Sequence, residues 1–219
     1  MKIISYEALL PFYHWIWRRW RDQRWIRFRT WIEPTPADRV LDVGGCAYDW
    51  QERGDLIGMV DLLNLIPASS QELSNAPKMQ CIQGDGRALE FDDLAYDIVF
   101  SNSVLEHVGD WKDQQAFAAE TRRVGQRLWI QTPAKACPVE PHYLGLFIHW
   151  FPVAWHVPLA RWTSVVGLTG AADLQSIAST TRLLTKSEFR SLFPDCEIWT
   201  ERLLWVFPKS YVAIRRHSK

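Results

Sequence analysis

The segment Arg39–Trp50 (Arg-Val-Leu-Asp-Val-Gly-Gly-Cys-Ala-Tyr-Asp-Trp) constrains the fold of this 219-residue chain more than any other. It predicts a buried strand that stops at Gly44 and Gly45 and is followed by a helix, with Asp42 near the strand's carboxyl end. In an open α/β sheet this place is a crevice where nucleoside-like ligands bind. Glycine lacks a Cβ, so the backbone can turn sharply there and approach a ligand closely.

The details of this turn argue against a dinucleotide site. A G-x-G-x-x-G fingerprint starting at Gly44 requires glycines where the chain has Cys46 and Asp49. A carboxylate at Asp49, near the start of the helix, would also repel a pyrophosphate. The pattern therefore favours a pocket for a nucleoside without phosphates.

The stretch 41–45 (Leu-Asp-Val-Gly-Gly) resembles the first motif of the class I S-adenosylmethionine-dependent methyltransferases, in particular the type 11-like group that acts on small molecules. That motif reads hydrophobic-Leu-Asp-hydrophobic-Gly-x-Gly and is followed by a helix. The family's second and third glycines are replaced here by Cys46 and Tyr48. The resemblance implies S-adenosyl-L-methionine as the cofactor, bound by Asp42, Gly44 and Gly45.

The bulk composition sets limits on the class of protein. The length suits one α/β domain with a sizeable core. Twenty-five acidic and 25 basic residues balance, so no global charge favours a nucleic-acid partner. The start of the chain lacks a signal-peptide pattern, which predicts a cytoplasmic protein. The four cysteines have no metal-like spacing and are expected to be reduced: Cys46, Cys81, Cys137 and Cys196.

Residues 1–36 are predicted to form an N-terminal extension outside the main domain. The part from Tyr6 to Ile32 is rich in Trp and Arg and has no glycine, which predicts a helix. It can pack on the domain's edge with its arginines solvated. It can instead lie at a lipid headgroup boundary, where Trp and Arg commonly occur together. Basic and aromatic residues also alternate in nucleic-acid binders, but nothing later in the chain supports that partner.

Residues 37–219 are predicted to form an α/β domain whose strands alternate with helices, which indicates a parallel sheet. A helix is expected at Thr185–Phe193, with Thr185 as its N-cap and Glu188 completing a capping box. Residues 197–200 and 211–214 are expected to pair as antiparallel strands, similar to the family's sixth and seventh strands. The predicted fold is thus Rossmann-like: a seven-stranded, mostly parallel sheet with helices on both faces and the last strand antiparallel. The first five strands are placed at 39–43, 56–60, 79–83, 96–100 and 127–131, and helical segments at 48–53 and around Phe117, Ala118, Thr121 and Val124.

The segment Tyr143–Ala160 has no charged residue and is long enough to suggest a membrane span. Two prolines, two histidines and a glycine within it argue against one. We expect an apolar, cap-like insertion around 138–180 on the substrate side. The alternative is a peripheral, monotopic contact with a membrane.

Two acidic residues are candidate contacts of the adenosyl group. Asp61 follows the second predicted strand at a spacing that suits an acid binding ribose hydroxyls; otherwise it is a solvated loop residue. Asp85, in Gly84-Asp85-Gly86, matches the acid that reaches the adenine amino group in the family. The flanking glycines would also suit a plain turn aspartate. Gly86 is counted with Asp85 in the cofactor site.

The stretch 97–108 (Asp-Ile-Val-Phe-Ser-Asn-Ser-Val-Leu-Glu-His-Val) is similar to the family's fourth strand and the Leu-Glu-His-like motif after it. The resemblance implies that residues 101–103 line the place where methyl group and acceptor meet, with Asn102 in the cofactor site. His107 would orient the substrate or the loop. The alternative is a buried, hydrogen-bonded histidine.

The stretch 132–142 (Thr-Pro-Ala-Lys-Ala-Cys-Pro-Val-Glu-Pro-His) resembles the turn and Glu-x-His motif that follow the family's fifth strand. Glu140 and His142 are therefore a candidate catalytic pair, with His142 as the base. His142, His149 and His156 recur at a constant interval, as metal ligands on one helix could. Prolines interrupt that helix, so we predict no metal site and expect His149 to line a pocket.

The predicted reaction is an in-line displacement in which the protein chiefly aligns nucleophile and methyl group. A general base helps if the acceptor is a hydroxyl. The leading hypothesis is methyl transfer to a small or medium-sized, partly apolar acceptor, a saccharide or glycan-precursor hydroxyl. The alternative is a catalytically inactive methyltransferase-like domain that binds a partner or a membrane.

Overall fold

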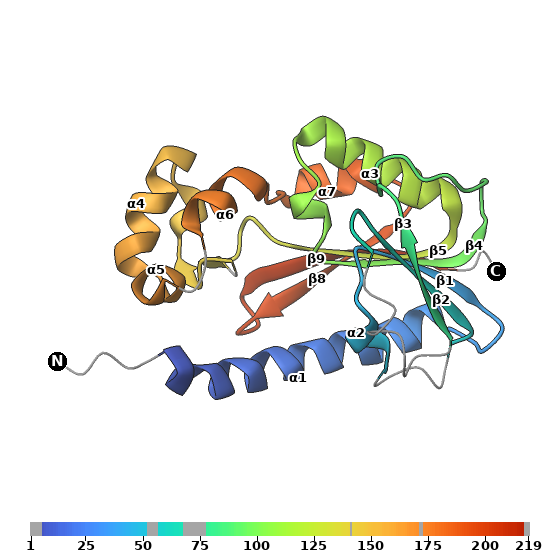
Figure 1. Cartoon of the computed structure of the whole chain (residues 1–219), viewed down its shortest axis with the longest axis horizontal. Coiled ribbons are helices and arrows are strands. Elements are labelled where there is room, and N and C mark those ends of the chain that lie inside the picture. The colour runs from blue at the N-terminus through green and yellow to red at the C-terminus, as the bar shows by residue number, and fades with distance from the viewer. Residues whose placement is uncertain (1–5, 52–56, 68–77, 141, 171–172, 217–219) are drawn as a thin grey trace. The chain divides into compact units, whose positions relative to one another are not determined.

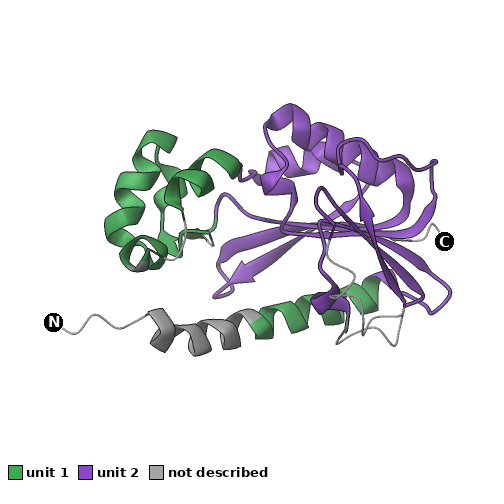
Figure 2. Ribbon diagram, in the orientation of Figure 1, with its two compact units in different colours: residues 1–31, 137–181 green, residues 32–136, 182–219 purple. Residues whose placement is uncertain are grey.

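The structure is a computed structural model that describes residues 6–51, 57–67, 78–140, 142–170 and 173–216 (Figure 1). The chain divides into two compact units (Figure 2). Unit 1 comprises residues 1–31 and 137–181, and unit 2 comprises residues 32–136 and 182–219. The two units are described one after the other.

Unit 2 is built on a seven-stranded sheet in the order β3-β2-β1-β4-β5-β9-β8. Strand β9 runs antiparallel to both of its neighbours, and the pairs among β1 to β5 are parallel. This confirms the predicted α/β class with an antiparallel last strand. The strands are β1 Arg39–Val43, β2 Met59–Asn64, β3 Met79–Gln83, β4 Tyr96–Asn102, β5 Gly125–Pro133, β8 Glu197–Leu203 and β9 Phe207–Arg215.

Helices cover both faces of this sheet. Helix α3 (Trp111–Val124) and helix α7 (Lys186–Leu192) lie on one face, and the short helix α2 (Ala47–Gln51) lies on the other (Figure 1). Thr185 and Glu188 form the predicted capping box at the start of α7. The four positions of α3 predicted to face the core are all buried: Phe117, Ala118, Thr121 and Val124.

The core of unit 2 lies between the sheet and helices α3 and α7. Strands buried on both faces read as apolar runs, and β1 fits this pattern because only its first residue is exposed. The apolar run of β1 therefore explains why its predicted bounds agree with the structure. The predicted bounds of β3, which is only partly buried, agree as well. Its members include Leu41, Tyr96, Val99, Phe117, Leu128, Phe189, Phe193 and Tyr211.

Strand β2 differs from its predicted position at 56–60. It begins at Met59 and continues to Asn64, so Asp61 lies in the middle of the strand and does not follow it. A carboxylate is rarely fully buried unless it is paired. Here it is paired, by donors from three different strands, so the strand continues. Leu56 lies outside the described residues.

Unit 1 contains helix α1 (Tyr6–Ile32), whose predicted bounds are confirmed and whose last residue belongs to unit 2. Its second part packs a small core around Tyr143, Ile148 and Ala160. No described helix combines the length and apolar character needed to cross a membrane. The second part consists of β6 Val139–Glu140, β7 Gly145–Leu146, η3 Ile148–Trp150, α4 Val153–Thr163, α5 Val165–Thr169 and α6 Leu174–Thr180.

Candidate active site

A cavity of about 470 Å³ lies in unit 2, where the carboxyl ends of four neighbouring parallel strands meet. Loops that follow such strands converge at one edge of the sheet, so residues far apart in sequence come together there. The lining comes from the ends of β1 to β4 and from α3. It consists of Val43, Gly44, Leu63, Asn64, Leu65, Ile66, Gly84, Asp85, Gly86, Arg87, Ser103, Val104, His107, Val108 and Phe117.

Gly44 forms the sharp turn at the end of β1 and requires glycine for two reasons. Its φ is +79°, in the region that side chains disfavour. A Cβ there would also lie 2.5 Å from Cγ2 of Val104. The backbone N–H of Gly44 donates to the carbonyl of Leu63 at 2.8 Å, which fixes the turn against β2.

Asp42 lies beneath this turn and does not line the cavity. It is buried, and its Oδ2 accepts a hydrogen bond from Nε1 of Trp50 at 2.6 Å. A Cβ on Gly45 would lie 1.8 Å from the same oxygen, so Gly45 leaves room for the carboxylate. Burial raises the pKa of Asp42 to about 7. Asp42, Gly45 and Trp50 therefore support the turn from within the fold.

The two residues that replace the family's later glycines lie outside the described cavity lining. Cys46 and Tyr48 are both exposed. The thiol of Cys46 lies 3.5 Å from Oδ2 of Asp49 and donates to it. Neither residue lines the described cavity, so the departure from the motif does not narrow it.

Asp61 is fully buried inside the sheet, and its carboxylate is occupied by protein donors. Oδ2 accepts from Nη2 of Arg39 and from the hydroxyl of Tyr96, both at 2.7 Å. Oδ1 accepts from Nε2 of Gln80 at 2.6 Å. Asp61 does not line the described cavity. Its surroundings suit a structural carboxylate.

Asn64 occupies the end of β2, where Asp61 was expected, and it lines the cavity. Its side-chain amide donates to the carbonyl of Gly45 at 2.9 Å, which ties the end of β2 to the glycine turn. The sequence reading missed Asn64 because it ended β2 too early. Extending the apolar run past Asp61 to Leu62 and Leu63 would have placed Asn64 at the strand's end.

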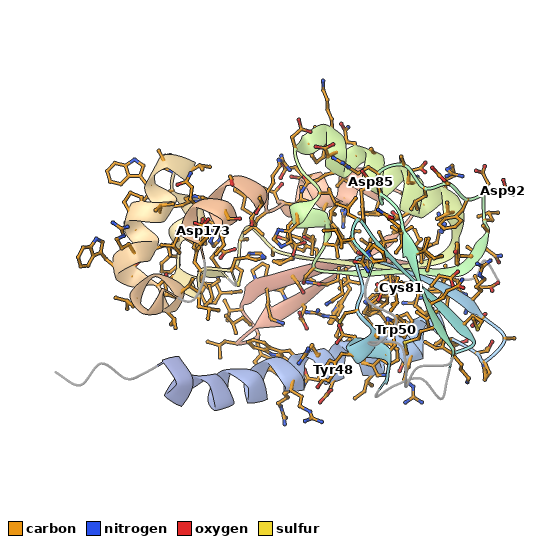
Figure 3. All side chains as sticks on the ribbon, viewed as in Figure 1. Tyr48, Trp50, Cys81, Asp85, Asp92 and Asp173 are labelled. Atoms are coloured by element: carbon orange, nitrogen blue, oxygen red, sulfur yellow. The ribbon has the colours of Figure 1, made fainter. Side chains whose placement is uncertain are left out.

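Asp85 lies in a tight turn after β3 and lines the cavity (Figure 3). The carbonyl of Asp85 accepts from the N–H of Ala88 at 3.0 Å, which closes the turn. Hydrogen bonds from the guanidinium of Arg87 hold the pKa of Asp85 below its ordinary value, so the carboxylate is charged at neutral pH. A Cβ on Gly86 would lie 2.8 Å from Phe117, so this turn packs directly on α3.

Arg87 links three parts of the cavity wall and was not singled out from the sequence. Its Nη2 donates to Oδ2 of Asp85 at 2.7 Å. Its Nη1 donates to Oδ1 of Asp113, in the first turn of α3, at 2.8 Å and to the carbonyl of Val108 at 3.3 Å. An arginine two residues after a turn aspartate was the available signal, because it can bind that carboxylate bidentately.

The three small polar residues at the end of β4 point to different places. Ser101 is buried and its hydroxyl donates to the carbonyl of Val43 at 2.9 Å. Asn102 is half-buried at the last position of the strand and is not part of the described lining. Ser103 lines the cavity with a φ of +59°. Its hydroxyl donates to Oε1 of Gln131 at 2.9 Å.

His107 ends a short 3-10 helix, η2 (Leu105–His107), and lines the cavity with an exposed side chain. The expectation of a possible buried histidine is wrong for this position. The neighbouring Glu106 is the buried residue, and its Oε2 accepts from the hydroxyl of Thr132 at 2.9 Å. This bond fastens the turn that carries His107 to the end of β5.

Glu140 and His142 form a hydrogen-bonded pair within unit 1. Oε1 of the buried Glu140 lies 2.7 Å from Nδ1 of His142. Oε2 accepts from the backbone N–H of Tyr143 at 2.6 Å, which orients the carboxylate. A carboxylate on one ring nitrogen fixes the tautomer and favours protonation of the ring. The pair has the internal geometry expected of a general base and its orienting acid.

The predicted site residues thus fall into distinct groups. Gly44, Asp85, Gly86 and His107 line one cavity, and Asp42 and Gly45 support its first loop. Asp61 and Asn102 belong to the sheet outside the described lining. Glu140 and His142 belong to unit 1, together with His149 and with His156, whose Nε2 lies 2.9 Å from the carbonyl of Phe151.

Residues 41–127 match a family model described as a methyltransferase domain. No curated protein sequence matches the chain significantly. Among solved structures, a protein from Pyrococcus horikoshii is similar with a TM-score of 0.54 at 14% identity, over 90% of this chain and 89% of that one.

Two further solved structures are similar. One is a complex between the Haloferax volcanii Trm112 methyltransferase activator and a protein assigned as a methyltransferase, with a TM-score of 0.53, 15% identity and 91% of each chain covered. The other, assigned as a sarcosine dimethylglycine methyltransferase from Galdieria sulphuraria, has a TM-score of 0.50 and 15% identity, over 84% of this chain and 62% of that one. At such identities the likeness establishes the fold.

The family match implies S-adenosyl-L-methionine as the cofactor, and the cavity residues fit an adenosyl group. Backbone can approach a ligand at Gly44, Asn64 offers a neutral amide, and Asp85 offers a charged carboxylate. Apolar residues supply the remaining walls. Residues 41–127 therefore match a methyltransferase domain, and the chain has the Rossmann-like fold of the solved methyltransferase structures it resembles.

Proposed function

We propose that this protein transfers the methyl group of S-adenosyl-L-methionine to a hydroxyl of a small or medium-sized, partly apolar acceptor, namely a saccharide or glycan precursor. The observation that best supports this is the cavity at the ends of β1 to β4, where Gly44, Asn64 and Asp85 present three different polar surfaces. Such a set suits a nucleoside, because an amide and a carboxylate can hydrogen-bond to ribose hydroxyls and to an exocyclic amino group.

Asp85 and Asn64 can each form hydrogen bonds with the adenosyl group. The charged carboxylate of Asp85 can accept hydrogen bonds from an exocyclic amino group. The amide of Asn64 can both donate and accept, which suits ribose hydroxyls. When bound, the cofactor supplies an electrophilic methyl group on a sulfonium. The protein's main contribution is then to hold the acceptor oxygen in line with it.

The apolar part of the lining supports a partly apolar acceptor. Leu65 and Ile66 follow β2 directly, and both are exposed while lining the cavity. Val104 and Val108 add apolar surface beside His107. Apolar walls exclude water, which protects a reactive methyl group from hydrolysis.

A hydroxyl acceptor must lose its proton during transfer, so a base assists the reaction. We assign this role to His142, because the buried carboxylate of Glu140 lies 2.7 Å from its Nδ1 and would stabilise the protonated ring. His107, which lines the cavity, is assigned to orienting the acceptor. Both assignments rest on the chemistry of the side chains.

Calorimetry with S-adenosylmethionine and S-adenosylhomocysteine tests the cofactor part of this proposal. We expect saturable binding of both; an absence of binding at millimolar concentrations would overturn it. Transfer of a labelled methyl group onto a panel of saccharides tests the acceptor part, with amine and carboxylate compounds of similar size as controls. Cofactor binding without transfer to any hydroxyl acceptor would favour an inactive binding domain.

A further inference from the structure

The second part of unit 1, residues 137–181, exposes more large apolar side chains than it buries. Its described core contains Tyr143, Ile148, Ala160 and a few partly buried neighbours. A small helical segment that only had to fold in water would keep its aromatic residues inside. The exposed apolar surface of this segment comprises Leu146, Phe147, Trp150, Phe151, Val153, Trp155, Trp162 and Leu168.

The tryptophans of helix α4 share one side of the helix. Trp155 and Trp162 are seven residues apart, which is close to two turns, and their exposed fractions are 59% and 75%. Phe147, just before η3, is exposed and has a φ of +59°, which is unusual for a residue with a large side chain. Phe147 therefore has a disfavoured backbone conformation, and its ring is nevertheless exposed to solvent.

This surface carries little charge. Among residues 146–168 the sequence has no Asp, Glu or Lys and one arginine, Arg161. Protein–protein contacts usually surround an apolar centre with polar and charged residues. Tryptophan and phenylalanine with few neighbouring charges are instead typical of the boundary between water and a lipid bilayer.

The other part of unit 1 carries a strong positive charge. Residues 18–31 contain six arginines and one aspartate. Exposed arginines here are Arg18, Arg19, Arg27 and Arg29. A second copy of this chain would bring the same positive segment and be repelled, whereas anionic lipid headgroups would be attracted.

We propose that unit 1 binds the surface of an anionic lipid bilayer. The exposed aromatic side chains of residues 146–168 enter the headgroup region, and the arginines of α1 contact lipid phosphates. No described helix is suited to cross a membrane, so the contact is peripheral. This proposal is independent of methyl transfer, because lipid binding by unit 1 requires no cofactor.

Co-sedimentation of the full chain with vesicles tests the proposal. One set of vesicles contains phosphatidylglycerol in phosphatidylcholine, and the other contains phosphatidylcholine alone. We expect stronger binding to the anionic vesicles and a decrease with rising salt, because screening weakens the arginine contribution. Absence of binding of the wild-type chain to the anionic vesicles would overturn the proposal.

The double substitution Trp155→Ser with Trp162→Ser is the decisive variant. We expect it to weaken binding to the anionic vesicles about tenfold or more, because it removes two large interfacial side chains. The matched control is Leu204→Ser with Trp205→Ser, at the tip of the β8–β9 hairpin in unit 2, where Trp205 is 93% exposed. Equal losses in both variants would mean that no particular surface is involved, and unchanged binding of the α4 variant would exclude this surface.

Two measurements separate this proposal from others. In calorimetry, the α4 variant should bind S-adenosylhomocysteine with the wild-type affinity, which shows that unit 2 is intact. If the wild-type chain binds vesicles but not the cofactor, the proposed function is contradicted and the lipid proposal stands. Analytical ultracentrifugation should give the same mass for wild type and variant. A dimer that dissociates on substitution of Trp155 and Trp162, in a chain that does not bind vesicles, would assign the surface to self-association and overturn the proposal.

Discussion

Arg87 lowers the pKa of Asp85 and is itself held by Asp113 and the carbonyl of Val108. One guanidinium therefore positions the carboxylate of the cavity and joins its turn to the start of α3. The pKa of Asp42 is shifted in the opposite direction because its carboxylate is buried, where it accepts a hydrogen bond from Nε1 of Trp50. Two aspartates of the same cavity region thus differ in charge at a given pH because of their surroundings.

Replacing Asp85 with Asn should weaken binding of S-adenosylmethionine by about tenfold, because a hydrogen bond to a charged acceptor is worth roughly 1.5–3 kcal/mol. Calorimetry measures the change. Asp92→Asn is the matched control, since Asp92 is exposed and lies outside the described lining (Figure 3). Equal affinities for the two variants would show that Asp85 does not contact the cofactor.

Asp42 should make the folding stability depend on pH. Its pKa is about 7 in the folded chain, whereas an unfolded aspartate has a pKa near 4. The folded chain therefore holds this proton more tightly, so stability decreases as the pH rises from about 4 to about 7 and levels off above that. The size of this loss is on the order of 4 kcal/mol, because each pKa unit corresponds to about 1.4 kcal/mol.

Thermal unfolding of wild type and of Asp42→Asn, between pH 4.5 and pH 8 in steps of about one unit, measures this effect. The variant keeps a side chain of the same size but does not titrate, so the difference between the two curves isolates Asp42. We expect the wild type to lose stability relative to the variant as the pH rises. A constant difference across the range would contradict a raised pKa.

At the scale of elements, the sequence predicted the bounds of β1 and β3 correctly. Strands β1 and β3 were placed correctly because Val40, Leu41 and Val43, or the stretch 79–83, lie between clear turn signals. Strand β2 was misplaced because Asp61 interrupts its apolar run. The partners that make this burial tolerable, Arg39 and Tyr96, are 22 and 35 residues away and cannot be paired with it from sequence spacing.

The same limit applies to the cavity. Gly44, Asp85 and Gly86 were predicted because glycines and a turn aspartate have a local signature. Asn64 and Arg87 were missed because their roles depend on where β2 ends and on which loops adjoin in space. A prediction from sequence therefore identified the loops of the site better than the side chains that hold them together.

The β8–β9 hairpin has a tip that is strained and apolar. Leu204 and Trp205 have φ values of 50° and 65°. Turns of this kind favour Asn-Gly, because those residues tolerate positive φ. The double substitution Leu204→Asn with Trp205→Gly should therefore raise the stability by about 1 kcal/mol or more.

Thermal and denaturant unfolding measure this change. The control is Leu94→Asn, since Leu94 is also exposed and has a φ of 57° but lies outside the hairpin. A destabilised hairpin variant would show that the apolar tip makes contacts that outweigh its backbone strain.

At the scale of the whole molecule, the sheet unit is interrupted by residues 137–181 and then resumes. The two ends of this interruption are joined within unit 2. Ala134 pairs with Leu184 in a parallel bridge, and the N–H of Lys135 donates to the carbonyl of Leu184 at 2.9 Å. The core of unit 2 contains residues from both sides of the interruption and none from within it.

Replacing residues 137–181 with a short Gly-Ser linker should leave unit 2 folded, because closing a short loop between adjacent ends costs little entropy. We expect cooperative unfolding and an affinity for S-adenosylhomocysteine within about threefold of the full chain. Methyl transfer should be lost, because Glu140 and His142 are removed. Calorimetry and circular dichroism measure both properties, and an unfolded product would show that unit 2 depends on the insertion.

The bridge between Ala134 and Leu184 has a consequence for how such a chain can change over evolution. Residues added, removed or exchanged between these two points do not alter the register of β5 with β9, which is set elsewhere in the sheet. Selection can therefore act on the inserted helices without re-optimising the cofactor cavity. One contiguous segment of such a chain can therefore be exchanged while the loops at the strand ends keep their places in the sheet.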